Sequence, residues 1–137
     1  MSKGEKFFLP SAFHIHYDGI DAEHEELVRI VNGLFAAKHT DGHRPDSLEP
    51  FIRLLGIHFE NEERHMAALA YPGLAWHRDH HAECLARARE LALECERRGG
   101  IDDEIIDRCF EEVVHEVARA DLKFGEFVEG REDSGGD

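Results

Sequence analysis

The chain has 137 residues, of which 42% are hydrophobic and 34% charged, and its formal net charge at pH 7 is -14. This composition is sufficient for one domain with a buried core and excludes a disordered chain. The acidic balance repels phosphate backbones and anionic lipids, so nucleic acids and membranes are poor partners. No apolar run approaches the roughly 20 residues that span a bilayer, and no signal peptide is recognisable, so we expect a cytoplasmic protein.

The numbers and positions of the cysteines and histidines indicate which kind of site the protein can contain. The three cysteines are odd in number and scattered, which favours buried free thiols over a disulfide framework or a zinc site with paired cysteines. The chain also contains 11 histidines, which are dispersed and therefore do not form a purification tag. A dispersed excess of histidine is typical of a metal site.

The N-terminal part combines an irregular segment with a first helix. Residues 1–19 contain Pro10 and several aromatic residues, and we expect them to form an irregular arm packed on the body. Asp21 is predicted to cap a helix over residues 22–38, in which apolar residues recur at helical spacing. The following sequence HTDGHRPD ends this helix with glycine and proline.

Two further helices are predicted in the middle of the chain. Ser47 is predicted to open a second helix over residues 47–70, which ends at the Tyr71-Pro72-Gly73 turn. A third helix, rich in alanine, leucine and glutamate, is predicted over residues 74–97 and stops at two consecutive glycines.

The fourth predicted helix completes the fold. Either Asp102 or Asp103 starts it, it spans residues 102–128, and residues 129–137 are expected to form a disordered tail. Four amphipathic helices joined by short loops predict an all-α, up-down-up-down four-helix bundle over residues 20–128. Its oligomeric state stays open, with a monomer favoured.

Polar residues point into the apolar stripe of every predicted helix when each is drawn at about 100° per residue. A lone inward histidine is more often a core residue, and an isolated HxxxH pair arises by chance, so the combination on four helices carries the prediction. Burying such groups without partners is costly, and a shared pair of cations would compensate them. Nitrogen and oxygen ligands together suit iron best, with manganese and zinc as alternatives. The inward residues are His24, His58, Glu62, His77, His81 and Asp121.

Three stretches resemble the signatures of the hemerythrin family: IDAEH at 20–24, HFENEERHM at 58–66 and YPGLAWHRDHH at 71–81. The resemblance covers about residues 12–128, and the HFxxEExxM match is highly specific. It implies two iron ions (Fe2+/Fe3+) with an oxo or hydroxo bridge, five histidine ligands, two bridging carboxylates, and dioxygen binding at an open position on one iron. By position, the resemblance places His24 and His58 on one iron and His77 and His81 on the other, with Glu62 and Asp121 bridging.

The fourth helix departs from the family pattern, in which a histidine stands five residues before the bridging aspartate. That position here is Glu116, next to His115. With Val117 at the centre of the apolar stripe, a straight helix puts Asp121 about 40° to one side and Glu116 about 100° to the other. His115 would point about 160° away. We therefore predict Glu116 as the replacement ligand; the alternative is a one-residue π-bulge that turns His115 inward and leaves Glu116 at the surface.

His65 is a second departure, because it faces inward where the family has an aliphatic residue. Glu62-x-x-His65 has the spacing of ferritin-like di-iron sites. His65 is therefore a core-edge histidine bonded to a carboxylate, an additional metal ligand, or a group whose N–H orients a ligand. His80, beside the main histidine pair, is predicted to lie at a helix–helix edge.

The resemblance implies reversible dioxygen binding for storage, delivery or sensing, without chemical turnover. The alternative is a di-iron oxidase or peroxidase-like enzyme that acts on dioxygen, peroxide or nitric oxide. The extra carboxylate at Glu116 favours this alternative, because added negative charge stabilises the ferric state.

Overall fold

A computed structural model describes residues 7–9, 18–39 and 47–135 of the chain. Within these ranges the chain forms helices and no strand, which confirms the all-α prediction. The helices are α1 (Asp18–His39), α2 (Glu49–Ala68), α3 (Leu74–Arg98), α4 (Asp103–Glu116), the short π-helix η2 (Val117–Asp121) and α5 (Leu122–Gly135).

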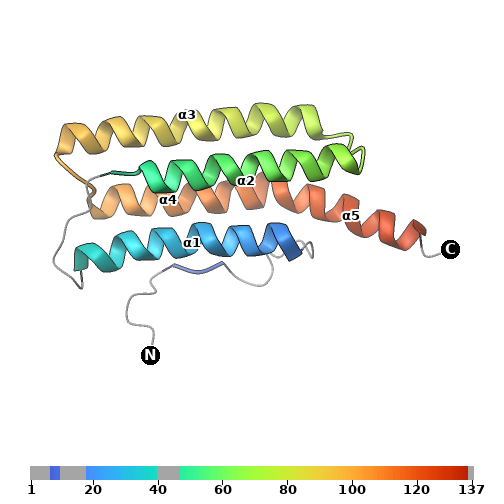
Figure 1. Cartoon of the computed structure of the whole chain (residues 1–137), viewed down its shortest axis with the longest axis horizontal. Helices are drawn as coiled ribbons and strands as arrows, with labels where there is room; N and C mark the ends of the chain where they lie inside the picture. The colour runs from blue at the N-terminus through green and yellow to red at the C-terminus, as the bar shows by residue number, and fades with distance from the viewer. Residues whose placement is uncertain (1–6, 10–17, 40–46, 136–137) are drawn as a thin grey trace.

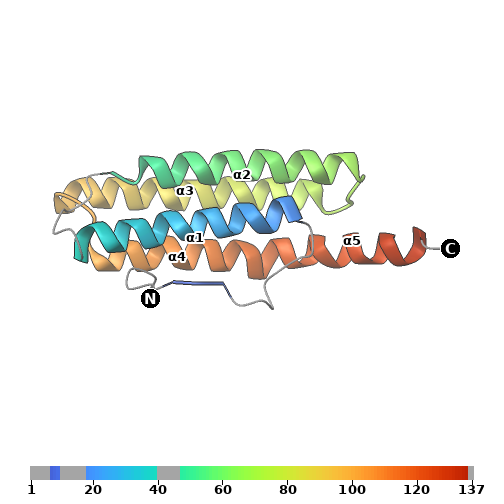
Figure 2. The same ribbon diagram turned by 60° about the horizontal axis from the view of Figure 1, so that its bottom comes forward.

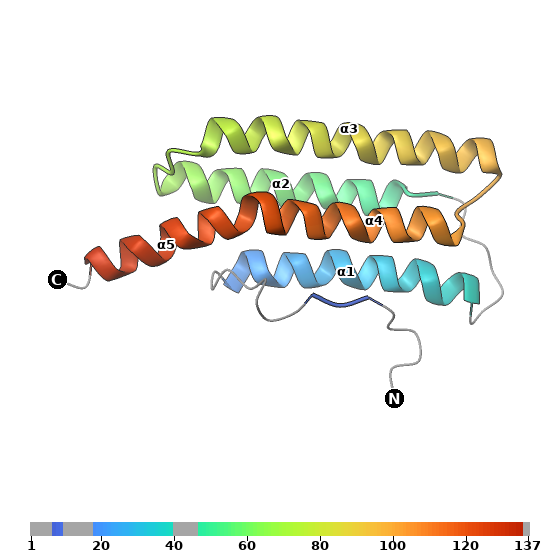
Figure 3. The same ribbon diagram turned by 180° about the vertical axis from the view of Figure 1, so that it is seen from behind.

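Successive helices run in opposite directions and lie side by side (Figure 1). α1 and α3 each pack against both α2 and α4, so the four helices surround one core. α4, η2 and α5 form one long rod that continues past the end of the other helices (Figures 2 and 3). This arrangement is the up-down-up-down bundle that the sequence predicts.

The described part of the predicted arm, residues 7–9, lies along α1 (Figures 1 and 3). The Phe7 N–H donates to Asn32 Oδ1 at 2.9 Å, and Asn32 Nδ2 donates to the Phe7 carbonyl at 2.8 Å. Pro10, most of the rest of the arm, and residues 40–46 lie outside the described residues. The division into arm, bundle and tail stays a prediction.

α1 begins at Asp18, so Asp21 lies inside the helix and the prediction that it caps the helix is wrong. The reason is Ile20, which is only 1% exposed and packs with Met66 and Phe124. Burying an isoleucine side chain contributes about 1.5–3 kcal/mol, whereas an N-cap contributes about 1 kcal/mol. Packing therefore extends the helix past its predicted cap.

The other helix ends lie close to their predicted positions. The Glu49 N–H donates to Ser47 Oγ at 3.0 Å where α2 begins, and the Ile105 N–H donates to Asp102 Oδ1 at 3.0 Å, so Asp102 caps α4. Gly99 follows α3 with φ 77°, a left-handed conformation that favours glycine. α5 continues past residue 128, its predicted end, because the sequence EGRE at 129–132 contains three good helix formers.

Buried apolar side chains form two clusters along the bundle, and the inward polar residues lie between them. On α1, His24 stands between Ile20 of the smaller cluster and Leu27 of the larger one. The other helices repeat this order. The two clusters therefore enclose a polar layer and shield it from water at both ends.

The turn between α2 and α3 closes the smaller cluster. A Cβ at Gly73 would lie 2.8 Å from the Tyr71 ring, so glycine at this position lets the ring fold back over the bundle. The Tyr71 ring centroid lies 5.1 Å from that of Phe124 and 5.9 Å from that of His77. The turn therefore brings an aromatic ring to the edge of the polar layer.

No helix in the described ranges combines the length and the apolar character needed to cross a lipid bilayer.

The three cysteines are buried and free of disulfides, as predicted. Burial raises the pKa of Cys109 to about 12 and, together with the charge of Glu112, raises the pKa of Cys84. We therefore expect the native protein to resist a thiol reagent such as DTNB near pH ~8, and its thiols to react once guanidinium unfolds the chain. Ala86→Cys, at an exposed position of α3, should react at once in the native state. Rapid labelling of the native wild-type protein would contradict this expectation.

Candidate metal centre

Each rod of the bundle contributes histidines or carboxylates to the polar layer. α1 and α2 supply three of them, α3 supplies two histidines, and the α4–η2 rod supplies two carboxylates. All are buried, and no residue among them is more than 2% exposed. These residues are His24, His58, Glu62, His77, His81, Glu116 and Asp121.

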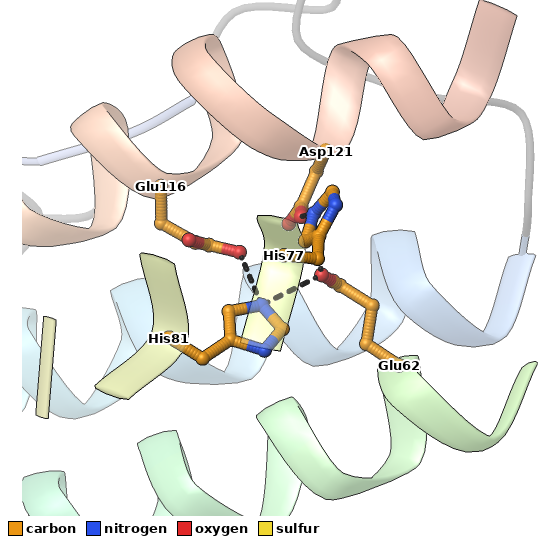
Figure 4. Close-up of side chains that lie close together, drawn as sticks. All are labelled: Glu62, His77, His81, Glu116 and Asp121. Carbon is orange, nitrogen blue, oxygen red and sulfur yellow. Dashed lines mark hydrogen bonds and ion pairs between the residues drawn. The ribbon is translucent and has the colours of Figure 1, made fainter. Parts of the chain in front are cut away.

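The ligand atoms of this layer fall into two groups, and within each group they lie within 4.8 Å of one another. Glu62 and Asp121 belong to both groups. Carboxylates shared in this way can bridge two cations, as in other di-metal sites built inside helix bundles. One group adds His24 and His58, and the other adds His77, His81 and Glu116 (Figure 4).

Each shared carboxylate turns one oxygen to each group. Asp121 Oδ2 lies 2.6 Å from His24 Nε2, whereas Asp121 Oδ1 lies 3.1 Å from His77 Nε2. Glu62 Oε2 lies 3.1 Å from His58 Nε2, whereas Glu62 Oε1 lies 3.1 Å from His81 Nε2. The Nε2 atoms of all four histidines therefore face oxygens of the two shared carboxylates.

Unpartnered buried atoms in the described part of the chain show that this layer fits a metal pair. His58 Nε2 and Glu62 Oε2 have no hydrogen-bond partner there, although both atoms are buried and lie 3.1 Å apart. Leaving such an atom unpaired costs about 1–3 kcal/mol. A cation between the imidazole nitrogen and the carboxylate oxygen would satisfy both atoms at once.

Two further carboxylates orient the histidines from outside. His58 Nδ1 donates to Glu23 Oε1 at 2.7 Å, and His81 Nδ1 donates to Glu63 Oε2 at 2.7 Å. Such bonds fix the ring so that Nε2 faces the centre and raise its basicity. Neither carboxylate was predicted from the sequence. The available signal was their position, because Glu23 precedes His24 and Glu63 follows Glu62.

Imidazoles and carboxylates in the layer lie close enough to shift one another's pKa values. Burial lowers the pKa of His81, but hydrogen bonds with Glu116 and Glu62 outweigh burial and raise the pKa to about 10. Burial raises the pKa of Asp121, but its hydrogen bonds with Glu62 and the histidines hold the pKa well below its usual range. Glu116 differs, because burial and the charge of Asp121 raise its pKa to about 7.

A π-helix sets the direction of the two carboxylates on the fourth rod. Residues five positions apart in a straight α-helix differ in direction by about 140°. η2 adds one residue to a turn and so takes up about 100° of this difference. Glu116 and Asp121, at the two sides of this turn, are both buried and face the same group (Figure 4).

The histidines left open by the sequence are placed as follows. Glu116 is the inward residue, as predicted; the alternative, in which a π-bulge turns His115 inward and leaves Glu116 at the surface, is wrong, because the π-helix follows Glu116 and His115 is exposed. His65 is half-buried and belongs to neither ligand group. His80 is not merely an edge residue as predicted: it is buried, and its Nε2 lies 3.0 Å from Glu116 Oε2. That the seven buried residues are metal ligands stays a prediction.

The fold and the site define a class, a four-helix bundle whose buried histidines and shared carboxylates suit a pair of metal ions. No model of a known protein family matches the chain. The chain is 27% identical to myohemerythrin-1 of Phascolopsis gouldii over 120 residues, which are 88% of this chain and 92% of that protein. It is 30% identical to a hemerythrin subunit of Sipunculus nudus over 88 residues, 64% of this chain and 70% of that protein. Bacteriohemerythrin of Ralstonia nicotianae is 31% identical over 80 residues, 58% of this chain and 57% of that protein. The chain belongs to the hemerythrin family.

Deleting Ala118, an exposed residue of η2, tests the role of the π-helix. Without the extra residue the turn becomes regular α-helix, in which Glu116 and Asp121 stand four positions apart and differ in direction by about 40°, as they do across η2. We therefore expect helix content in circular dichroism and bound metal in elemental analysis both to be retained. Deletion of Glu111, an exposed residue in the regular part of α4, is the contrast: it turns the residues before it by about 100° relative to the site and should lower both the melting temperature and the metal content. Loss of metal after deletion of Ala118 would show that the extra residue of η2 is not what brings the two carboxylates to one side.

Proposed function

We propose that this chain is a non-heme di-iron protein that binds dioxygen reversibly in its bundle core, for storage, delivery or sensing. The observation that carries the proposal is the pair of buried ligand groups joined by Glu62 and Asp121. Membership of the hemerythrin family supports iron as the metal and dioxygen as the ligand.

In this proposal His24 and His58 hold one iron, and the second is held by His77, His81 and Glu116. Glu62 and Asp121 bridge the two, with an oxo or hydroxo bridge completing the centre. When bound, the iron pair supplies reversible electron transfer to dioxygen. Buried apolar residues on both sides, among them Ile20, Leu55 and Val113, exclude water from the layer and so slow irreversible oxidation.

Dioxygen is expected to enter on the side of His24 and His58. This group contains four protein ligands, whereas the other contains five, so coordination is more open here. A cavity of about 160 Å³ between α1 and α2 reaches His58, and its lining combines the apolar Leu54 and Ile57 with Glu23 and Glu26. A path from this cavity past the His58 ring would bring a small ligand to the more open metal position.

We also propose a monomer in the cytoplasm. Buried cysteines without disulfides suit a reducing compartment. A net charge of -14 keeps copies of the chain apart in solution.

Reversibility is the test of the carrier proposal. Ferrous protein prepared without oxygen should develop a visible absorption band in air, and the band should disappear when dioxygen is removed, over repeated cycles. Irreversible conversion to the ferric state, or steady consumption of peroxide with an added reductant, would instead support the oxidase or peroxidase-like alternative. His39→Ala is a matched control, because this exposed histidine lies about 22 Å along α1 from His24.

Removing a bridging carboxylate should empty both metal positions. We expect Asp121→Asn and Glu62→Gln to reduce bound iron from about two ions per chain to fewer than one, because each carboxylate serves both groups. Metal at a hundredfold excess over Kd should stabilise the wild-type protein by about 2.7 kcal/mol and so raise its melting temperature. The melting temperatures of both variants should stay unchanged. Elemental analysis also distinguishes iron from manganese and zinc. Variants that keep two ions per chain would exclude the bridging roles.

A further inference from the structure

His80 lies just outside the ligand groups and contacts one of their members. It is 9% exposed, and its Nε2 lies 3.0 Å from Glu116 Oε2. The other oxygen of this carboxylate, Glu116 Oε1, lies 2.9 Å from His81 Nε2. The two oxygens of Glu116 therefore face two different histidines of α3, one within the metal centre and one outside it.

A glutamate at this position needs such a neighbour. Glu116 stands where the resemblance to hemerythrins implies a histidine, and a glutamate side chain has one more rotatable bond than a histidine. When one oxygen faces the centre, the other is left buried and in need of a polar partner. In the described part of the chain, neither Glu116 Oε2 nor His80 Nε2 has a hydrogen-bond partner of good geometry, although the two atoms lie 3.0 Å apart as an ion pair. A small rotation of either side chain would turn this contact into a hydrogen bond and compensate both atoms.

The ring of His80 stacks between two other aromatic rings. It stacks on Trp76, with centroids 5.1 Å apart and planes at 11°, and on His115, with centroids 5.6 Å apart and planes at 26°. The Lys123 ammonium lies 4.7 Å from the centre of the Trp76 ring. His115, which the sequence offered as a ligand, therefore packs against the residue that contacts the actual inward carboxylate.

We propose that His80 is a positioning residue for Glu116: it holds the outer carboxylate oxygen and so presents the inner oxygen to the second metal ion. This inference rests on the proposed function and adds a residue to that site. Partners of metal ligands in other proteins typically change metal affinity by about 10–100-fold when they are removed. The same loss is expected here, and only at the metal position that Glu116 serves.

The first experiment compares two variants of this histidine. Glutamine in His80→Gln keeps an N–H donor near the position of Nε2, whereas His80→Leu removes the donor and keeps a similar volume. In Co2+ titrations followed by visible absorption, we expect His80→Leu to weaken binding of the second ion about 10–100-fold and to change its spectrum. His80→Gln should stay close to wild type. Wild-type affinity and spectrum in His80→Leu would overturn the inference.

The second experiment asks whether His80 acts through Glu116. Glu116→His supplies an imidazole ligand that has no second oxygen for His80 to hold. In the Glu116→His background, His80→Leu should therefore cause no further loss of Co2+ affinity. An equal loss in both backgrounds would show a general packing role and overturn the inference. Wild-type protein that binds no Co2+ or iron would instead overturn the proposed function, and this inference with it.

Discussion

The structure depends on compensating the charges that four helices bury in one layer. Glu62 and Asp121 are fully buried, and each lies within about one hydrogen-bond length of two or more imidazoles. Water cannot screen these groups, so their mutual positions decide whether the layer stabilises or destabilises the fold. A buried charge network is favourable only when every member is satisfied. This requirement explains why the layer needs a fixed geometry.

The apolar parts of the bundle provide that geometry. The larger cluster anchors one end of every helix, and the smaller cluster, closed by Tyr71 and Phe124, anchors the other. Helices clamped on both sides of a polar layer cannot slide without separating close-packed side chains. Outside the layer, Glu23 and Glu63 hold His58 and His81 by their Nδ1 atoms. Packing thus sets where the helices lie, and hydrogen bonds set how the rings turn.

The sequence predicts those parts of the site that lie on regular helix. His58 and Glu62, or His77 and His81, are four residues apart, so a constant turn of about 100° per residue places both on one face. It does not predict η2, because the extra residue in a π-turn has no signature in residue types; the straight-helix projection therefore left Glu116 well to one side. The early start of α1 has a similar cause, since it depends on contacts of Ile20 with distant residues. Glu23 and Glu63 were missed because their partners lie on neighbouring helices.

The replacement at position 116 changes what the rest of the layer must provide. An imidazole offers one nitrogen to a metal and turns its other nitrogen outward, where a single acceptor satisfies it. A carboxylate instead brings a full negative charge and a second oxygen that also requires a donor. α3 carries three histidines in the order H-x-x-H-H, and the middle one, His80, meets that second oxygen. The nitrogen absent from the fourth helix thus has a counterpart on α3, at ion-pair distance from the carboxylate. A substitution that looks like the loss of a ligand is, in three dimensions, a change in a network of at least two residues.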